Sequence, residues 1–287
     1  MSAPSVTPAA AAWRRLRANR MAFACLIGFA LICLACAVGP LVCGWFGRDG
    51  TTLDLDLLAS APSWSHPLGT DSLGRDLLVR VLEGGRVALV VGFTATAVAL
   101  VIGVSWGAIA GYAGGWVDTV MMRIVDVLYG FPVAVFVIVV RAVFDLHDLL
   151  SLTVLIGLVS WLTMARIVRG QVLSLRRREF VEAARALGVP PLRILYRHVV
   201  PNTLGAVVVY ATVLVPQAML IETFLSFIGL GVQAPLASWG TLVTEGSTQV
   251  AVSPWVLAGP GLVMGAAIFA LNFVGDGLRD ALDPQSR

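Results

Sequence analysis

Two carboxylates, Asp126 and Glu222, lie within apolar stretches long enough to cross a membrane. Ionisable side chains are costly inside a bilayer, and those found there commonly line a substrate path or relay protons. Both positions also lie near the expected ends of their stretches, where a carboxylate can reach water. We therefore take both as candidates for a substrate path, with a solvated helix end as the alternative for each.

The other residues with catalytic potential lack partners at a useful spacing. His66 and His147 fall in polar stretches without a second ligand at a zinc-type spacing. All the cysteines lie within or beside the first apolar stretch, where packing is commoner than redox chemistry or metal binding: Cys25, Cys33, Cys36 and Cys43. We predict neither a catalytic residue nor a metal site in this chain.

A charged hairpin, residues 176–202, separates two of the apolar stretches. Helical spacing sorts its first half into an apolar face and a charged face: Phe180, Val181, Ala184 and Leu187 on the first, Glu179, Glu182 and Arg185 on the second. Gly188 suits the left-handed position that follows a helix, and Pro190 and Pro191 end one helix and can open another. The pattern predicts two short helices that meet at an angle.

The charged hairpin suits contact with another protein. Ala183, Ala184 and Gly188 are small enough to allow close approach, whereas Glu179 and Glu182 would be repelled by anionic lipid headgroups. A basic amphipathic helix that lies on those headgroups is the alternative.

The composition of the chain is that of a membrane protein. Hydrophobic residues make up 58% of the chain and charged residues 13%, and the mean hydropathy is +0.87. That composition lies outside the range of ordinary soluble domains. Long uncharged windows predict six spanning helices, near residues 22–44, 87–110, 124–144, 149–166, 203–225 and 256–276.

The placement of the basic residues predicts the orientation. All 20 of them are arginines. With a cytoplasmic N-terminus and six spans, most fall on the cytoplasmic side, as the positive-inside rule requires. The exceptions are Arg48, Arg75, Arg80, Arg86 and Arg141. We therefore predict that both termini are cytoplasmic.

Two apolar stretches allow a second interpretation. The first span resembles a signal peptide in its basic start, but the uncharged run from Met21 to Gly47 is too long for a signal peptide's apolar region, so we expect an anchor. Residues 223–244 could form a seventh span. Their glycines and prolines would leave backbone groups unsatisfied in lipid, so we expect an outer loop or a partly re-entrant segment there.

The charged hairpin resembles the EAA loop of permease subunits of ATP-binding-cassette (ABC) importers. Glu182-Ala183-Ala184, Gly188 and Pro201 stand at that family's spacing, and His198 occupies a place where many members have isoleucine. Three further segments are similar to the second permease of dipeptide and oligopeptide importers: "HPLGTDSLGRDLLVRVLEGGRVAL" (66–89), "FLSFIGLGVQAPLASWG" (224–240) and "LNFVGDGLRDALDP" (271–284).

The resemblance implies an all-α polytopic membrane protein of the bacterial cytoplasmic (inner) membrane, with six transmembrane helices and a cytoplasmic coupling helix, the type I importer permease architecture. Together with the hydropathy and charge patterns, this gives a predicted layout of five parts: a cytoplasmic tail (1–21), a first transmembrane anchor (22–44), an extracytoplasmic loop (45–86) with a short amphipathic helix from Ser72 to Leu82, a core permease domain with five spans and the EAA loop (87–278), and a cytoplasmic tail (279–287).

The resemblance also implies partners besides membrane lipid: a second homologous permease, two ABC ATPases and an extracytoplasmic solute-binding protein. The ATPase-coupling residues would be Glu179, Glu182, Ala183, Ala184, Arg185, Leu187 and Gly188. ATP and Mg²⁺ would be bound by the partner ATPases, because the phosphate-binding loop needs a lysine and this chain has none. We expect this chain to bind neither a cofactor nor nucleic acid.

The expected function is therefore that of a pore-forming permease subunit in an ATP-driven importer of di- or oligopeptides, with nickel chelates or haem compatible with the same likeness. One alternative is an ion-coupled secondary transporter, which should show inverted repeats and broken helices near the bilayer centre. A second is a membrane scaffold that transports nothing, which the scarcity of central polar groups would suit.

Overall fold

The computed structural model describes residues 8–282, and these form helices with no β-sheet among them. The helices occur in this order: α1 (Pro8–Ala18), α2 (Arg20–Trp45), a 3₁₀ turn (Leu55–Leu57), α3 (Leu77–Ala113), α4 (Gly115–Tyr129), α5 (Val133–Phe144), α6 (Leu149–Leu175), α7 (Glu179–Ala186), α8 (Pro191–Ile194), a π-helical turn (Leu195–Val199), α9 (Val200–Phe227), α10 (Trp239–Ser247) and α11 (Pro254–Leu282). The all-α prediction is confirmed.

Five helical segments are long and apolar enough to cross a membrane: α2, α3, α6, the continuous run from Pro191 to Phe227, and α11. A sixth span exists if α4 and α5 together cross, but they meet at a bend of 85°. The span predicted near 124–144 is therefore broken between α4 and α5. Pro132 explains the break, because its ring disfavours helical geometry in the preceding residue and removes a backbone donor.

The second span is longer than predicted. Helix α3 begins at Leu77, with the Asp76 side chain accepting a hydrogen bond from Val79 N at 3.1 Å, so no separate helix starts at Ser72. Residues 77–86, which we assigned to the loop region and in part to that short helix, are instead the first three turns of α3. At its other end α3 stops at Gly114, whose φ of +67° forms a tight turn into α4.

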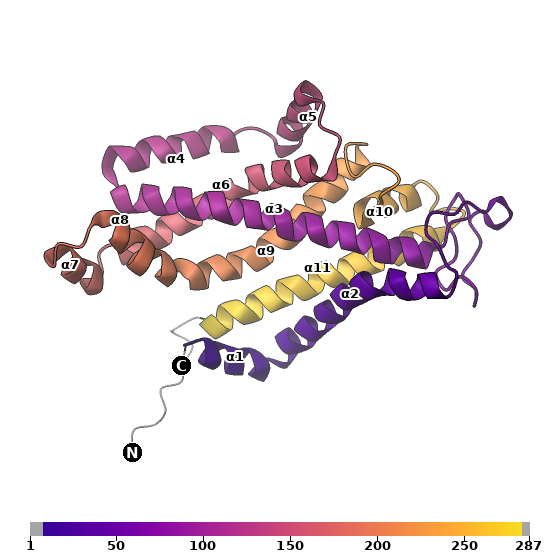
Figure 1. Ribbon diagram of the computed structural model, residues 1–287, viewed down its shortest axis with the longest axis horizontal. Helices are drawn as coiled ribbons and strands as arrows, with labels where there is room; N and C mark the ends of the chain where they lie inside the picture. The colour runs from indigo at the N-terminus through magenta and orange to yellow at the C-terminus, as the bar shows by residue number, and fades with distance from the viewer. Residues whose placement is uncertain (1–7, 283–287) are drawn as a thin grey trace, which may run out of the picture.

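Helices α3 and α6 pack closely along much of their length, as Figure 1 shows. Gly103, Gly107 and Gly111 recur at every fourth position on the face of α3 that meets α6. A Cβ atom at Gly107 would lie 2.3 Å from the carbonyl oxygen of Ala165. Small residues at such spacing allow two membrane helices to approach until their backbones touch.

The bundle has two distinct ends (Figure 1). One carries α1, α7 and the end of α11, and we call it the hairpin end. The other carries the loop of residues 46–76 and α10, and we call it the loop end. Residues 228–238 contain no helix and α10 has 9 residues, so the 223–244 stretch forms no further continuous span.

Candidate functional site

The charged hairpin contains one amphipathic helix, α7, between two turns. Glu179 and Glu182 stand in its first turn and Arg185 in its last, which suits the helix dipole at both ends. Gly188, at φ +73°, donates its N–H to Arg185 O at 2.9 Å, and Val189 donates to Ala184 O at 3.1 Å. This pair of bonds is a Schellman cap, for which glycine is favoured.

The second half of the charged hairpin differs from the prediction. Helix α8 is a single turn that continues through the π-helical turn into α9, so it is the beginning of a long membrane helix and not a separate short one. Pro191 opens this helix at a position where a missing N–H has no cost. On the other side, residues 176–178 separate α7 from α6. The hairpin is therefore directly continuous with only one of its two neighbouring spans.

Burial divides α7 in a way that simple helical spacing did not predict. Val181 and Ala184 are buried, and they pack in the same core cluster as Ile194. Phe180 and Leu187, assigned to the same apolar face, are 42% and 82% exposed. The remaining coupling candidates are also exposed: Glu179, Glu182, Ala183, Arg185 and Gly188. The free face of α7 therefore combines apolar, small and charged side chains.

Two arginines fasten the charged hairpin to the end of α3. Arg176 donates from Nη1 to the carbonyl oxygen of Gly111 at 3.1 Å. The guanidinium of Arg185 lies 5.4 Å from the centre of the Tyr112 ring, within range of a cation–π interaction. Arg185 therefore links α7 to the end of α3, and Arg176 links the segment between α6 and α7 to the same end.

Two ion pairs join α4 to α6 near the hairpin end. Arg169 donates to both oxygens of Asp118, at 2.5 Å and 2.7 Å, and Asp118 is buried. Arg166 donates to Asp126 at 2.9 Å, with the two side chains 41% and 51% exposed. Asp126, a candidate for the substrate path, is thus an exposed carboxylate with an arginine partner.

Glu222 occupies a different environment. Its side chain is 1% exposed, and its Oε1 accepts hydrogen bonds from Ser226 at 2.7 Å and Ser238 at 2.6 Å. Its Oε2 has no hydrogen-bond partner among the residues that the structure describes. Ser238 also caps α10, so Glu222 ties α9 to that helix. The expectation of a solvated helix end does not hold here, and the structure does not bring Glu222 and Asp126 together.

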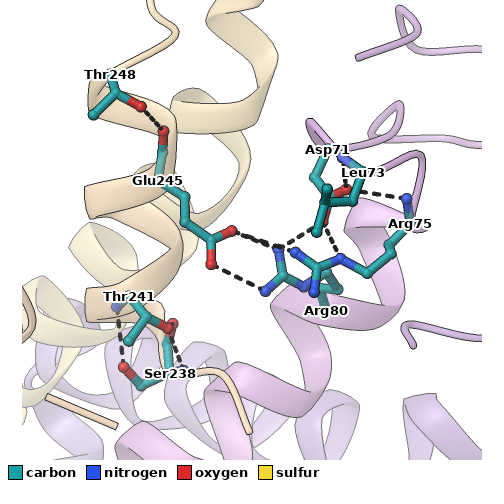
Figure 2. Close-up of polar contacts among 8 residues, drawn as sticks. All are labelled: Asp71, Leu73, Arg75, Arg80, Ser238, Thr241, Glu245 and Thr248. Carbon is teal, nitrogen blue, oxygen red and sulfur yellow. Dashed lines mark hydrogen bonds and ion pairs between the residues drawn. The ribbon is translucent and has the colours of Figure 1, made fainter. Parts of the chain in front are cut away.

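The loop end holds a charged network that sequence reasoning missed (Figure 2). Arg80 donates from Nη1 to Asp71 Oδ2 and to Glu245 Oε2, both at 2.6 Å, and Arg75 Nε donates to the same Asp71 oxygen at 2.7 Å. Asp71 is fully buried. The network fixes the loop of residues 46–76 to α3 and α10. An acid followed by arginines at the fourth and ninth positions was the signal available in the sequence.

No group of three potential metal ligands occurs within residues 8–282. His66 instead lies with Nδ1 2.9 Å from Asp76 Oδ2, next to the start of α3. His147 similarly pairs with Asp145 at 2.9 Å on an exposed turn. Both histidines have local partners that explain their positions.

Comparisons with known proteins match nearly the whole chain. Residues 103–287 match the family described as "Binding-protein-dependent transport system inner membrane component". Residues 7–57 match the "N-terminal TM domain of oligopeptide transport permease C".

Individual relatives are similar over most of their lengths. The chain is 51% identical to the oligopeptide transport system permease protein OppC of Escherichia coli (strain K12), over 96% of this chain and 90% of that protein. It is 40% identical to the dipeptide transport system permease protein DppC of Bacillus subtilis (strain 168), over 99% and 88%. A structure of the inward-facing MetNI methionine ABC transporter has a TM-score of 0.58 at 19% identity, covering 72% of this chain and 96% of that one, which supports the fold.

Proposed function

This chain belongs to the family of binding-protein-dependent transport system inner membrane components, and we propose that its solutes are di- or oligopeptides. It is a multi-pass membrane permease subunit, and its fold is that of an ABC importer permease. The peptide assignment is supported by relatives named for oligopeptide and dipeptide transport at 51% and 40% identity over nearly the whole chain.

The proposed assembly contains a second homologous permease, two ABC ATPases that bind ATP and Mg²⁺, and a solute-binding protein on the extracytoplasmic side. The hairpin end then faces the cytoplasm, which places both termini there. The loop end, with its fixed loop and α10, faces the solute-binding protein. We propose that Asp126, exposed and paired with Arg166, lines the solute path.

We propose that the charged hairpin couples to the ATPases, and the exposed face of α7 supports this proposal. Ala183 and Ala184 are neighbours in sequence, but Ala183 is exposed whereas Ala184 is buried. Phe180 and Leu187 add exposed apolar surface on the same short helix. Apolar side chains held out on a helix with a buried inner face suit insertion into a groove of another protein. When the ATPases move, the contacts of Arg176 and Arg185 with α3 would carry that motion into the spans.

A crosslinking experiment tests the coupling proposal. The four native cysteines are replaced by serine, and single cysteines are placed by Ala183→Cys and Ala184→Cys in membranes that contain the whole importer. A short reagent with one thiol-reactive end and one photoactivatable end should join the cysteine at 183 to an ATPase, and should do so at least tenfold less at 184. If a cysteine at 183 reaches only lipid or other permease surfaces, the proposed docking is wrong.

The peptide assignment needs a separate measurement. The purified importer, reconstituted with its solute-binding protein, should accumulate a labelled tripeptide in proteoliposomes when ATP is supplied. Accumulation driven by a proton or sodium gradient without ATP would instead support the ion-coupled alternative.

A further inference from the structure

Helix α1 lies at the level of a membrane surface, because α2 begins directly after it. Met21 to Gly47 contain no Asp, Glu, His, Lys or Arg, and of the 26 residues in α2 only Ala22, Phe29 and Cys36 are buried. Such a helix must face lipid along most of its length. Arg20, its first residue, therefore lies where the hydrocarbon meets the headgroups. Asn19 separates α1 from α2 and caps α2 by accepting from Ala22 N at 3.2 Å.

The position of α1 is fixed by a small cluster at the hairpin end. Leu16 is buried against Ala22 and Ala281. Gly277 allows this approach, since a Cβ there would lie 2.3 Å from the Cβ of Ala22 and 3.1 Å from Leu16 Cδ1. Helix α1 is therefore anchored beside the end of α11, as Figure 1 shows, and is not free to leave the membrane surface.

The exposed side of α1 is basic and aromatic. Arg14, Arg17 and Arg20 are exposed, and no acidic residue occurs before Asp49. Arg14 and Arg20 make no ion pair with any acid in the described part of the chain. Trp13 is 45% exposed, with the Arg17 guanidinium 5.0 Å from its ring centre. Tryptophan and arginine side by side are typical of the interface between water and lipid.

From this arrangement we propose that α1 is a binding site for anionic phospholipid headgroups of the leaflet at the hairpin end. Arg14, Arg17 and Arg20 contact the phosphates, and Trp13 inserts at the level of the glycerol groups. The site is uniformly positive, it lies in the headgroup layer, and the buried Leu16 keeps α1 in that position. Anionic lipid is the ligand that fits all three features. The inference does not depend on which solute the protein carries.

The test uses the full chain in phosphatidylcholine nanodiscs into which brominated phosphatidylglycerol is titrated. Bromine quenches nearby tryptophan, and the signal of Trp13 is the difference between the wild type and Trp13→Phe. An arginine near an anionic surface contributes about fivefold to binding. The double variant Arg14→Gln/Arg20→Gln should therefore need at least a tenfold higher fraction of phosphatidylglycerol for half-maximal quenching, with the stacked pair of Arg17 and Trp13 left intact.

Two controls make the result specific. Arg177→Gln/Arg178→Gln removes the same charge from exposed positions of the charged hairpin and should leave the quenching of Trp13 unchanged. Brominated phosphatidylcholine should quench Trp13 more weakly than phosphatidylglycerol at the same fraction. If the double variant inserts poorly, Arg14→Gln alone should give a shift of about fivefold.

Three outcomes would overturn the proposal. The two brominated lipids could quench Trp13 equally, the double variant could behave as the wild type, or neither lipid could quench Trp13 at all. Loss of ATPase co-purification in the double variant, with unchanged quenching, would show that this surface binds protein instead of lipid.

Discussion

Arg80 and Glu245 lie 165 residues apart in the chain, yet Nη1 of the first is 2.6 Å from Oε2 of the second. The same guanidinium nitrogen donates to Asp71, whose side chain is fully buried. Arg80 therefore neutralises one buried carboxylate and one that is 38% exposed. These two partners should differ greatly in what they contribute, because water screens the exposed one.

We expect Arg80→Met to destabilise the protein by up to roughly 3–5 kcal/mol, the cost of breaking a buried ion pair, because Arg75 remains as a partner that partly neutralises Asp71. Glu245→Gln should cost about 0–1 kcal/mol. The measurement is the thermal unfolding midpoint of the purified chain in mild detergent. Equal shifts for the two variants would contradict the division of roles within the network.

The glycines between α3 and α6 give a second prediction. Gly107→Ala places a Cβ 2.3 Å from a backbone oxygen, so the helices must separate, and we expect a loss of about 1–3 kcal/mol. Gly265→Ala is the matched control, since nothing lies within 4 Å of a Cβ at that position in α11. Its unfolding midpoint should stay the same or rise, because alanine favours a helix over glycine.

Gly188 tests the turn of the charged hairpin. No atom lies within 4 Å of a Cβ built there, so the effect of a substitution comes from the left-handed backbone and not from a clash. Gly188→Val should cost roughly 1–2 kcal/mol or more and alter the position of α7, whereas Gly188→Asn should be better tolerated. In reconstituted importer, the valine variant should retain ATP hydrolysis but lose solute-dependent transport.

Membrane insertion and co-purification of the ATPases serve as controls for this pair. Transport at the wild-type rate in Gly188→Val, with normal ATPase association, would count against the role of the hairpin.

Substitution of Glu222 distinguishes an ATP-driven importer from an ion-coupled transporter. Its Oε1 accepts hydrogen bonds from two serine hydroxyls, and a glutamine side chain would keep an acceptor oxygen at the same position. We expect Glu222→Gln to transport nearly as the wild type does. Glu222→Leu leaves both buried hydroxyls without their acceptor, at about 1–3 kcal/mol for each, and should loosen α10 from α9. The measurement is ATP-driven uptake beside the unfolding midpoint; abolished uptake in a stable Glu222→Gln protein would indicate a proton-carrying role.

Hydropathy and glycine placement predict the membrane architecture well. The uncharged windows locate the spanning helices, and the cap at Gly188 follows from local chemistry. These features depend on neighbouring residues, which a sequence displays directly.

The sequence-based predictions were wrong where tertiary contacts determine the structure. Because of their charges, we placed Glu83 and Arg86 in the loop region and Arg80 in a separate short helix, but α3 includes all three. Arg80 pairs with Asp71 and with the distant Glu245, and Arg86 donates to the carbonyl oxygens of residues 36 and 37 in α2. Glu222 appeared close to water, but α10 covers it. Phe180 and Leu187 matched an apolar face, yet only the inner part of α7 has a helix to pack against.

Helix α3 runs unbroken through 37 residues, about 55 Å at the usual rise, from the charged network at Arg80 to the contacts of Gly111 and Tyr112 with the charged hairpin. A continuous helix of that length connects both faces of the membrane without a break. We therefore expect that solute binding on one side of the membrane and ATPase movement on the other tilt α3 as a single rigid body. No chain of side-chain rearrangements between the two sides is needed.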